Sequence, residues 1–178
     1  MLETAENASF AVSPRGLTRE QFLMQFGGVY ENSDWVALAV LAAGLDPADD
    51  RIKHLANRMV AIVDAADDKR KLALLCAHPE LAGKLAINGG LTADSTAEQA
   101  SAGLDKCSPE EFNAFKALNT TYREKFGHPF IIAVRGLKRT DILAAFRHRI
   151  NNDKRTEFAT ALDEVHKIAQ LRLEMLAG

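Results

Sequence analysis

The 178-residue sequence is poor in cysteine, with only Cys76 and Cys107, and it has a single tryptophan. Two cysteines form neither a disulfide framework nor, by themselves, a metal site, and their scarcity weakly favours a reducing compartment. No apolar run approaches the roughly 20 residues that span a bilayer. The acidic first ten residues lack the apolar core of an export signal. We therefore expect a cytoplasmic protein without a membrane partner.

An excess of charge of either sign is also missing. There are 22 Lys and Arg residues against 24 Asp and Glu residues, which gives a net charge of -2 and an isoelectric point near 6.2. A nucleic-acid-binding surface usually needs a basic excess, so no nucleic-acid partner is predicted. The GxGxxG, Walker, HExxH, HxH, CxxC and GxSxG patterns are absent as well. The sequence predicts no bound metal and no cofactor.

What the sequence does contain is helical periodicity. Apolar residues recur three and four positions apart through most of the chain, and capping boxes precede several of these stretches. Helices are expected to begin near Thr18, Ser33 or Asp34, Asp46, Ser95, Ser108, Thr140 or Asp141, and Asp153. A short helix is also expected from Pro79 to about Ala86, because proline suits a first helical turn.

These patterns predict an all-α fold, a single compact domain of about seven to nine helices over residues 17–178. Residues 1–16 show no periodicity and are expected to form a flexible leader. The only strand-like run is Phe-Ile-Ile-Ala-Val at 130–134. Because one strand cannot build a sheet, we expect a short, buried extended segment near 129–135.

His78 lies where the helical pattern stops, directly before Pro79. The residue before proline is disfavoured in the α region, so a break is expected there. A rigid break suits an imidazole fixed in a cleft, although a lone histidine more often only satisfies a loop carbonyl. Among the other histidines, His128 is expected to reach a pocket or to shape a Gly-His-Pro turn. Solvated positions on polar helix faces are expected for His54, His148 and His166.

Ser95, Glu98 and Gln99 are spaced so that a helix places all three on one face. Two interpretations are open. Ser95 and Glu98 could form a capping box, which would use both side chains to close a helix end. Thr92 or Asp94 could cap the helix instead and leave Ser95 and Glu98 for a binding site.

Arg172 interrupts the apolar stripe of the last helix. The stripe runs through Phe158, Leu162 and Val165, and Arg172 completes the heptad after Val165. A buried arginine is costly without a partner. It either forms a salt bridge with a glutamate or extends past the rim, or it lies at the floor of a pocket and binds an anionic ligand.

Five blocks of sequence carry a family resemblance. They are FGGVYENSDWV at 26–36, HPELAG at 78–83, SxxEQ and AGL within 95–104, FGHPFIIAVR at 126–135, and a C-terminal pattern through Arg149, Asn151, Glu157, Ala161, Leu162, Ile168 and Arg172. In this order they resemble the 2-oxo-4-hydroxy-4-carboxy-5-ureidoimidazoline (OHCU) decarboxylases of uric acid degradation. The chain departs from the family pattern at Asn32, Asp34, Leu38 and His128, of which His128 could change the polarity of a pocket.

The resemblance implies an all-helical, cofactor-free homodimer that decarboxylates OHCU to (S)-allantoin and CO2. It makes His78 the catalytic histidine and Glu98 the catalytic carboxylate. The substrate-binding residues that it implies are Pro79, Ser95, Gln99, Phe130, Ile131, Ile132, Ala133 and Arg172. The conjugated ring of the substrate can accept the electrons left by CO2, which removes the need for a cofactor. Two other hypotheses are a non-enzymatic helical interaction domain and a hydrolase or metal enzyme built on His78, His128 and Glu98.

Overall fold

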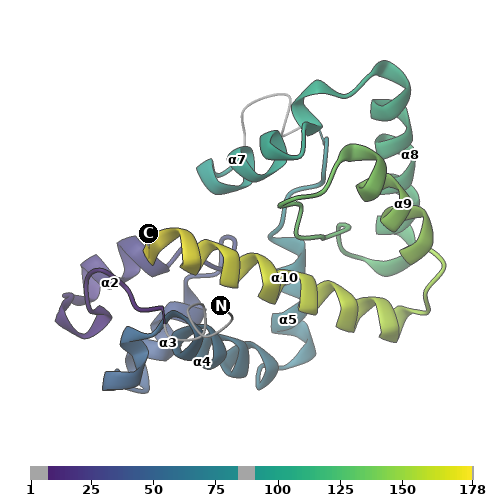
Figure 1. Ribbon diagram of the computed structural model, residues 1–178. Helices are drawn as coiled ribbons and strands as arrows, with labels where there is room; N and C mark the ends of the chain where they lie inside the picture. Colours follow the sequence, from purple (N-terminus) through teal and green to yellow (C-terminus); the bar gives the residue numbers. More distant parts are fainter. Residues whose placement is uncertain (1–7, 84–90, 178) are drawn as a thin grey trace. The chain divides into compact units, whose positions relative to one another are not determined.

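The computed structural model describes residues 8–83 and 91–177. This part of the chain contains eight α-helices and no strand, so the all-α class and the expected number of helices are confirmed (Figure 1). The α-helices are α2 (Arg19–Phe26), α3 (Trp35–Ala42), α4 (Ile52–Asp64), α5 (Asp68–Cys76), α7 (Ala93–Ser101), α8 (Pro109–Phe126), α9 (Arg139–Arg149) and α10 (Lys154–Ala177). Three short 3-10 helices accompany them: η1 (Pro14–Gly16), η2 (Pro47–Asp50) and η3 (Leu104–Lys106).

The contacts of the chain divide it into two compact units. The first unit comprises Met1–Ala77 with His166–Gly178, and the second comprises His78–Val165. Helix α10 therefore contributes its first part to the second unit and its last part to the first. None of the described helices is long and apolar enough to cross a membrane.

The first unit is built around α2 to α5 and the last turns of α10. Its buried side chains include Phe22, Phe26, Val40, Leu55, Met59 and Leu173. Thr18 and Gln21 form the predicted capping box of α2. Asp67 accepts a hydrogen bond from the Arg70 amide and thereby begins α5 as a helix separate from α4.

The later part of the predicted leader, residues 8–16, makes contacts within the first unit. Residues 8–16 pack on the first unit, because the Phe10 amide donates to the Asp50 carbonyl and the Phe10 side chain is buried. Ser9 forms an isolated bridge with Arg51, and Ser13 donates to the Asp50 carboxylate at 2.6 Å. Residues 1–7 of the leader lie outside the described residues.

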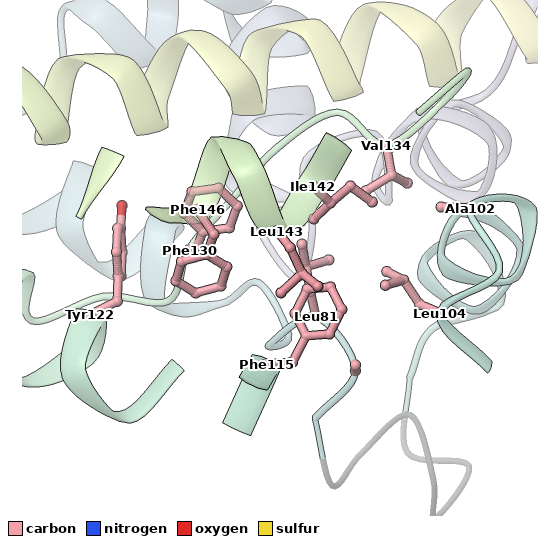
Figure 2. Close-up of a cluster of buried hydrophobic side chains, with 11 residues drawn as sticks. Leu81, Ala102, Leu104, Phe115, Tyr122, Phe130, Val134, Ile142, Leu143 and Phe146 are labelled. Atoms are coloured by element: carbon pink, nitrogen blue, oxygen red, sulfur yellow. The ribbon is translucent and has the colours of Figure 1, made fainter. Parts of the chain in front are cut away.

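The second unit contains α7, α8, α9 and the first turns of α10. Its apolar cluster, which Figure 2 shows, is built by side chains between Leu81 and Phe146. Phe130 and Phe146 are stacked with their centroids 3.9 Å apart, and the Tyr122 ring meets each of them edge-on. Residues 129–134 are neither helix nor strand, and Phe130, Ile131 and Val134 are buried. The expected extended segment is therefore present.

The start of the second unit differs from the expectation. Residues 79–83 form a turn rather than the beginning of a helix, and residues 84–86 of that predicted helix lie outside the described residues. Ala82 has a φ of 48°, in the left-handed region that a helix does not allow. Side-chain hydrogen bonds from α7 and α8 hold this turn, and one sequence gives no sign of such long-range partners.

Candidate active site

His78 follows the end of α5 and begins the second unit. Its side chain is only 7% exposed, so it is not a solvated loop histidine. Pro79 and Glu80 after it are half-buried, and Leu81 and Ala82 belong to the apolar cluster. The break that proline predicts thus places an imidazole at the edge of a packed core.

Residues 80–82, called here the amide-held segment, are fixed by neutral side chains. The Gln99 Oε1 atom accepts from the Ala82 amide at 3.1 Å, and Gln99 Nε2 donates to the Glu80 carbonyl at 3.4 Å. Asn119 Nδ2 donates to the Leu81 carbonyl at 3.0 Å. A half-exposed ion pair between Arg123 and the Glu80 side chain adds a contact at 2.9 Å. The segment that follows His78 is therefore fastened to both α7 and α8.

The cap of α7 decides between the two interpretations of Ser95 and Glu98. Thr92 Oγ1 accepts from the Ser95 amide at 3.3 Å, and Thr92 is the residue that begins the helix. The capping box of Ser95 with Glu98 is therefore not formed. Ser95 and Gln99 are buried, and Glu98 is half-buried on the same side of the helix.

Residues 130–132, called here the ion-pair-held segment, are fixed by a charged network. Arg149 Nη1 donates to the Ile131 carbonyl at 2.7 Å. Arg149 Nε and Nη2 donate to Glu157 Oε1 at 2.9 and 2.6 Å. Tyr122 Oη also donates to Glu157 Oε1, and Asn152 Nδ2 donates to Glu157 Oε2 at 2.7 Å. Burial, and then the bond to Glu157, hold the pKa of Tyr122 well above its ordinary value, so its hydroxyl stays protonated.

The Ala133 amide has a protein partner. It donates to Glu164 Oε2 at 2.8 Å, within the second unit. A backbone amide has one hydrogen, so this group is already used by Glu164.

Arg172 belongs to the first unit, whereas the other predicted site residues belong to the second. Its Nη1 lies 2.7 Å from Glu31 Oε2 and 3.2 Å from the Gly28 carbonyl oxygen, and both side chains of the pair are buried. The salt bridge with a glutamate, one of the alternatives open from the sequence, is therefore formed. Glu31 lies in the FGGVYE block, and the sequence pattern did not identify it as the partner of Arg172.

The remaining histidines take different positions. His128 is buried among Tyr122, Phe126 and Phe158, and its Nδ1 lies 3.0 Å from the Pro129 carbonyl oxygen. Burial lowers the pKa of His128, so it shapes the turn as a neutral ring. His166 is not solvated as expected: its Nδ1 lies 2.8 Å from Tyr30 Oη and its Nε2 lies 3.3 Å from Asp64 Oδ1.

Among residues 8–83 and 91–177, one group of side chains has the spacing of metal ligands. Asp46, Asp49 and His54 each offer one atom, and these atoms lie within 4.8 Å of one another. Arg58 forms an ion pair with the buried Asp49 and also donates to the Gly44 carbonyl at 2.8 Å. The arginine thus supplies positive charge to the two carboxylates, which fits a salt-bridge cluster in the first unit.

Sequence reasoning found no role for Arg149, Glu157 or Asn119. Arg149 and Glu157 matched the C-terminal family pattern, but their pairing needs a contact between α9 and α10 that periodicity does not reveal. A usable signal was present, because Glu157 sits beside Phe158 near the start of an apolar stripe. A carboxylate on a buried face needs a cation, and Arg149 continues the helical spacing of Ile142 and Phe146 on the buried face of α9.

The comparisons with known proteins agree with one another. The OHCU decarboxylase family model matches residues 15–174. The OHCU decarboxylase of Haloferax volcanii is 42% identical over 157 residues, which cover 88% of this chain and 89% of that protein. The mouse OHCU decarboxylase is 34% identical over 158 residues, with 89% and 87% covered.

Two solved structures are also similar. The crystal structure of (S)-allantoin synthase superimposes with a TM-score of 0.72 at 32% identity, over 93% of this chain and 54% of that one, so this chain spans about half of its length. An OHCU decarboxylase crystallised in the presence of (S)-allantoin gives a TM-score of 0.66 over 84% of this chain and 95% of that one. At 23% identity the second comparison shows the fold alone. The chain belongs to the OHCU decarboxylase family.

Proposed function

We propose that this chain decarboxylates OHCU to (S)-allantoin and CO2 in uric acid degradation, with His78 and Glu98 as its catalytic groups. The observation that carries the proposal is the family match over residues 15–174, which includes both residues. The local structure supports the assignment. His78 is buried at a rigid break, and Glu98 lies on the helix whose Gln99 holds the segment after His78.

The substrate supplies the electron sink, and the protein supplies orientation and one proton. Loss of CO2 leaves an electron pair that the conjugated ring of OHCU accepts. His78 then delivers a proton to one face of the ring, because an imidazole exchanges protons near neutral pH. Glu98 holds the imidazole or the hydroxyl and ureido groups of the substrate. Neither residue needs a cofactor for these roles.

Substrate contacts are proposed for Pro79, Ser95, Gln99, Phe130, Ile131, Ile132, Ala133 and Arg172. Hydrogen bonds within the protein limit what Gln99 and Ala133 can offer to the substrate. Gln99 Nε2 carries two N–H groups, so it can hold the Glu80 carbonyl and still offer one N–H to the substrate. The Ala133 amide is used by Glu164, which leaves Ala133 an apolar contact. Arg172 Nη1 already binds Glu31 and the Gly28 carbonyl, and its proposed substrate contact rests on the family resemblance.

The test is an assay with freshly generated 5-hydroxyisourate and its hydrolase, in which circular dichroism follows the appearance of one enantiomer of allantoin. The wild type is expected to accelerate this signal over the spontaneous reaction. His78→Ala and Glu98→Ala are each expected to fold and to lower the rate by at least ~100-fold, the low end for lost acid–base catalysis. His148→Ala, which changes an exposed histidine on α9, is the matched control and should keep the wild-type rate.

A wild-type protein that gives no acceleration would contradict the proposed reaction and favour an interaction domain. Normal turnover by His78→Ala at unchanged helical content would contradict only the assignment of the histidine. The family resemblance also leads us to propose a homodimer that acts in the cytoplasm. Light scattering after gel filtration tests the dimer, and a monomer at assay concentration would contradict it.

A further inference from the structure

A buried ion pair holds the backbone of the ion-pair-held segment, and the catalytic steps above do not use it. Arg149 makes three kinds of contact at once. Its Nη1 donates to the Ile131 carbonyl at 2.7 Å, its other nitrogens donate to Glu157, and its guanidinium carbon lies 4.5 Å from the Phe130 ring centroid. A carbonyl, a carboxylate and an aromatic face thus fix the planar guanidinium on three sides.

Glu157 fixes Arg149 in turn. The Glu157 side chain is 0% exposed, and both of its oxygens accept hydrogen bonds, from Arg149 and Tyr122 on one and from Asn152 on the other. Removal of one partner from a buried pair leaves an uncompensated charge, which is strongly unfavourable. Arg149 therefore has one stable position, and in that position it holds the Ile131 oxygen.

The planarity of the peptide bond carries this constraint to the next amide. The described chain has no cis peptide bond, so the Ile132 N–H points away from the Ile131 carbonyl oxygen. Anchoring of that oxygen on Arg149 therefore sets the direction of the Ile132 N–H. Within the described residues the Ile132 amide donates to no protein group, whereas the Ala133 amide donates to Glu164.

We propose that Arg149 is a positioning residue for decarboxylation, which holds the Ile131–Ile132 peptide so that this segment presents its N–H and side chains to the substrate. The proposal rests on the proposed function, since that function makes residues 130–132 a substrate contact. Arg149 acts through the Ile131 carbonyl, and Glu157 acts by holding Arg149. Misplacement of a contact by about 1 Å lowers catalysis by up to ~100-fold even when the changed residue is remote from the chemistry.

Two variants within the same network separate positioning from general stability. Arg149→Lys keeps a positive charge but loses the fork that binds Glu157 and Ile131 together. Tyr122→Phe removes one hydrogen bond to Glu157 and leaves the contact between Arg149 and Ile131 in place. The kcat and KM of both variants, of the wild type and of His78→Ala are measured at a temperature below their unfolding midpoints. A thermal unfolding curve is recorded for each protein.

Arg149→Lys is expected to lower kcat/KM by ~10- to 100-fold, with a raised KM. Tyr122→Phe should stay within about twofold of the wild type at a similar loss of thermal stability. Equal kinetics for the two variants would overturn the proposal. If Arg149→Lys does not fold, Glu157→Gln replaces it, because this substitution keeps the shape of the side chain and removes the charge that holds Arg149. Glu157→Gln must then show the same rise in KM, and an unchanged KM would overturn the proposal. An inactive wild type would instead contradict the proposed function, and an active His78→Ala would contradict its catalytic histidine.

Discussion

The amide-held segment and the ion-pair-held segment lie in the same unit, yet different chemistry fixes them. The first follows the predicted site residues His78 and Pro79, and the second is itself predicted to contact substrate. Neutral amides of Gln99 and Asn119 hold residues 80–82, whereas the Arg149–Glu157 pair holds the Ile131 carbonyl. A neutral hydrogen bond contributes modestly, about 0.5–1.5 kcal/mol net, and its loss is local. A buried ion pair contributes little as a whole, but loss of one partner is severe. The second segment should therefore tolerate substitution far less than the first.

The largest expected effect is at the buried carboxylate. Glu157→Ala leaves Arg149 charged in a buried site and should lower the free energy of unfolding by about 3–5 kcal/mol, measured by urea denaturation. Glu111→Ala is the control, because Glu111 pairs with Arg139 on a half-exposed surface and also closes the capping box of α8. That variant should cost about 1 kcal/mol. Equal costs for the two would show that burial does not make the Arg149–Glu157 pair more sensitive than a half-exposed pair.

The next effect is a dependence of stability on pH that comes from the buried His128, beside the ion-pair-held segment. Burial lowers the pKa of His128 below the ordinary 6.5, so the unfolded chain binds a proton that the folded chain does not bind in the interval between the two values. Stability should thus fall as the pH drops below 6.5 and should level off below the folded pKa. The slope is at most about 1.4 kcal/mol per pH unit.

Urea midpoints between neutral and acidic pH test this for the wild type and His128→Phe. The phenylalanine does not titrate, so the difference between the two proteins should shrink or reverse as the pH falls. Asn119→Leu changes no titrating group and should keep the pH dependence of the wild type. Parallel curves for the wild type and His128→Phe would show that His128 does not contribute.

The smallest effect is expected at the amide-held segment. Asn119→Leu removes the donor to the Leu81 carbonyl, but it also removes a buried Asn119 Oδ1 atom that has no partner in the described structure. The lost hydrogen bond is destabilising, and the removal of an unsatisfied buried oxygen is stabilising. The free energy of unfolding should therefore fall by only about 1 kcal/mol. A loss of about 3 kcal/mol or more would place this segment in the same class as the ion-pair-held one.

Local signals in the sequence predicted much of this fold. Thr18 with Gln21, and Ser108 with Glu111, marked helix starts that the structure contains. Gly103 and Gly127 end helices with φ values of 71° and 82°, which other residues rarely adopt. These signals act within a few residues, so a sequence alone contains them. The extended segment at 130–134 was predicted for the same reason, since its apolar run has no helical period.

The long-range contacts were not predictable in the same way. The helix expected from Pro79 was wrong over residues 79–83, because Gln99 and Asn119 bind carbonyl and amide groups that a helix would have used itself. The partner of Arg172 is Glu31, 141 residues away in the turn before α3, and the partner of Arg149 is Glu157, on the next helix. Periodicity shows that such a residue faces inward, but the tertiary packing decides which group it meets. The assignments of His78 and Glu98 came from the family resemblance and stay predictions.

Ala82 gives the amide-held segment a further property. For an alanine, the left-handed backbone conformation is less stable than the extended one by about 1 kcal/mol or more. The φ of 48° at Ala82 therefore persists because surrounding contacts hold it. A glycine would adopt this φ without strain, but it would also retain many other conformations in the unfolded chain. The alanine methyl is buried in the apolar cluster, and it also restricts the conformations that this residue can adopt in the unfolded chain. The turn after His78 therefore contains a strained backbone residue, and the hydrogen bond from the Ala82 amide to Gln99 is one of the contacts that hold it in that conformation.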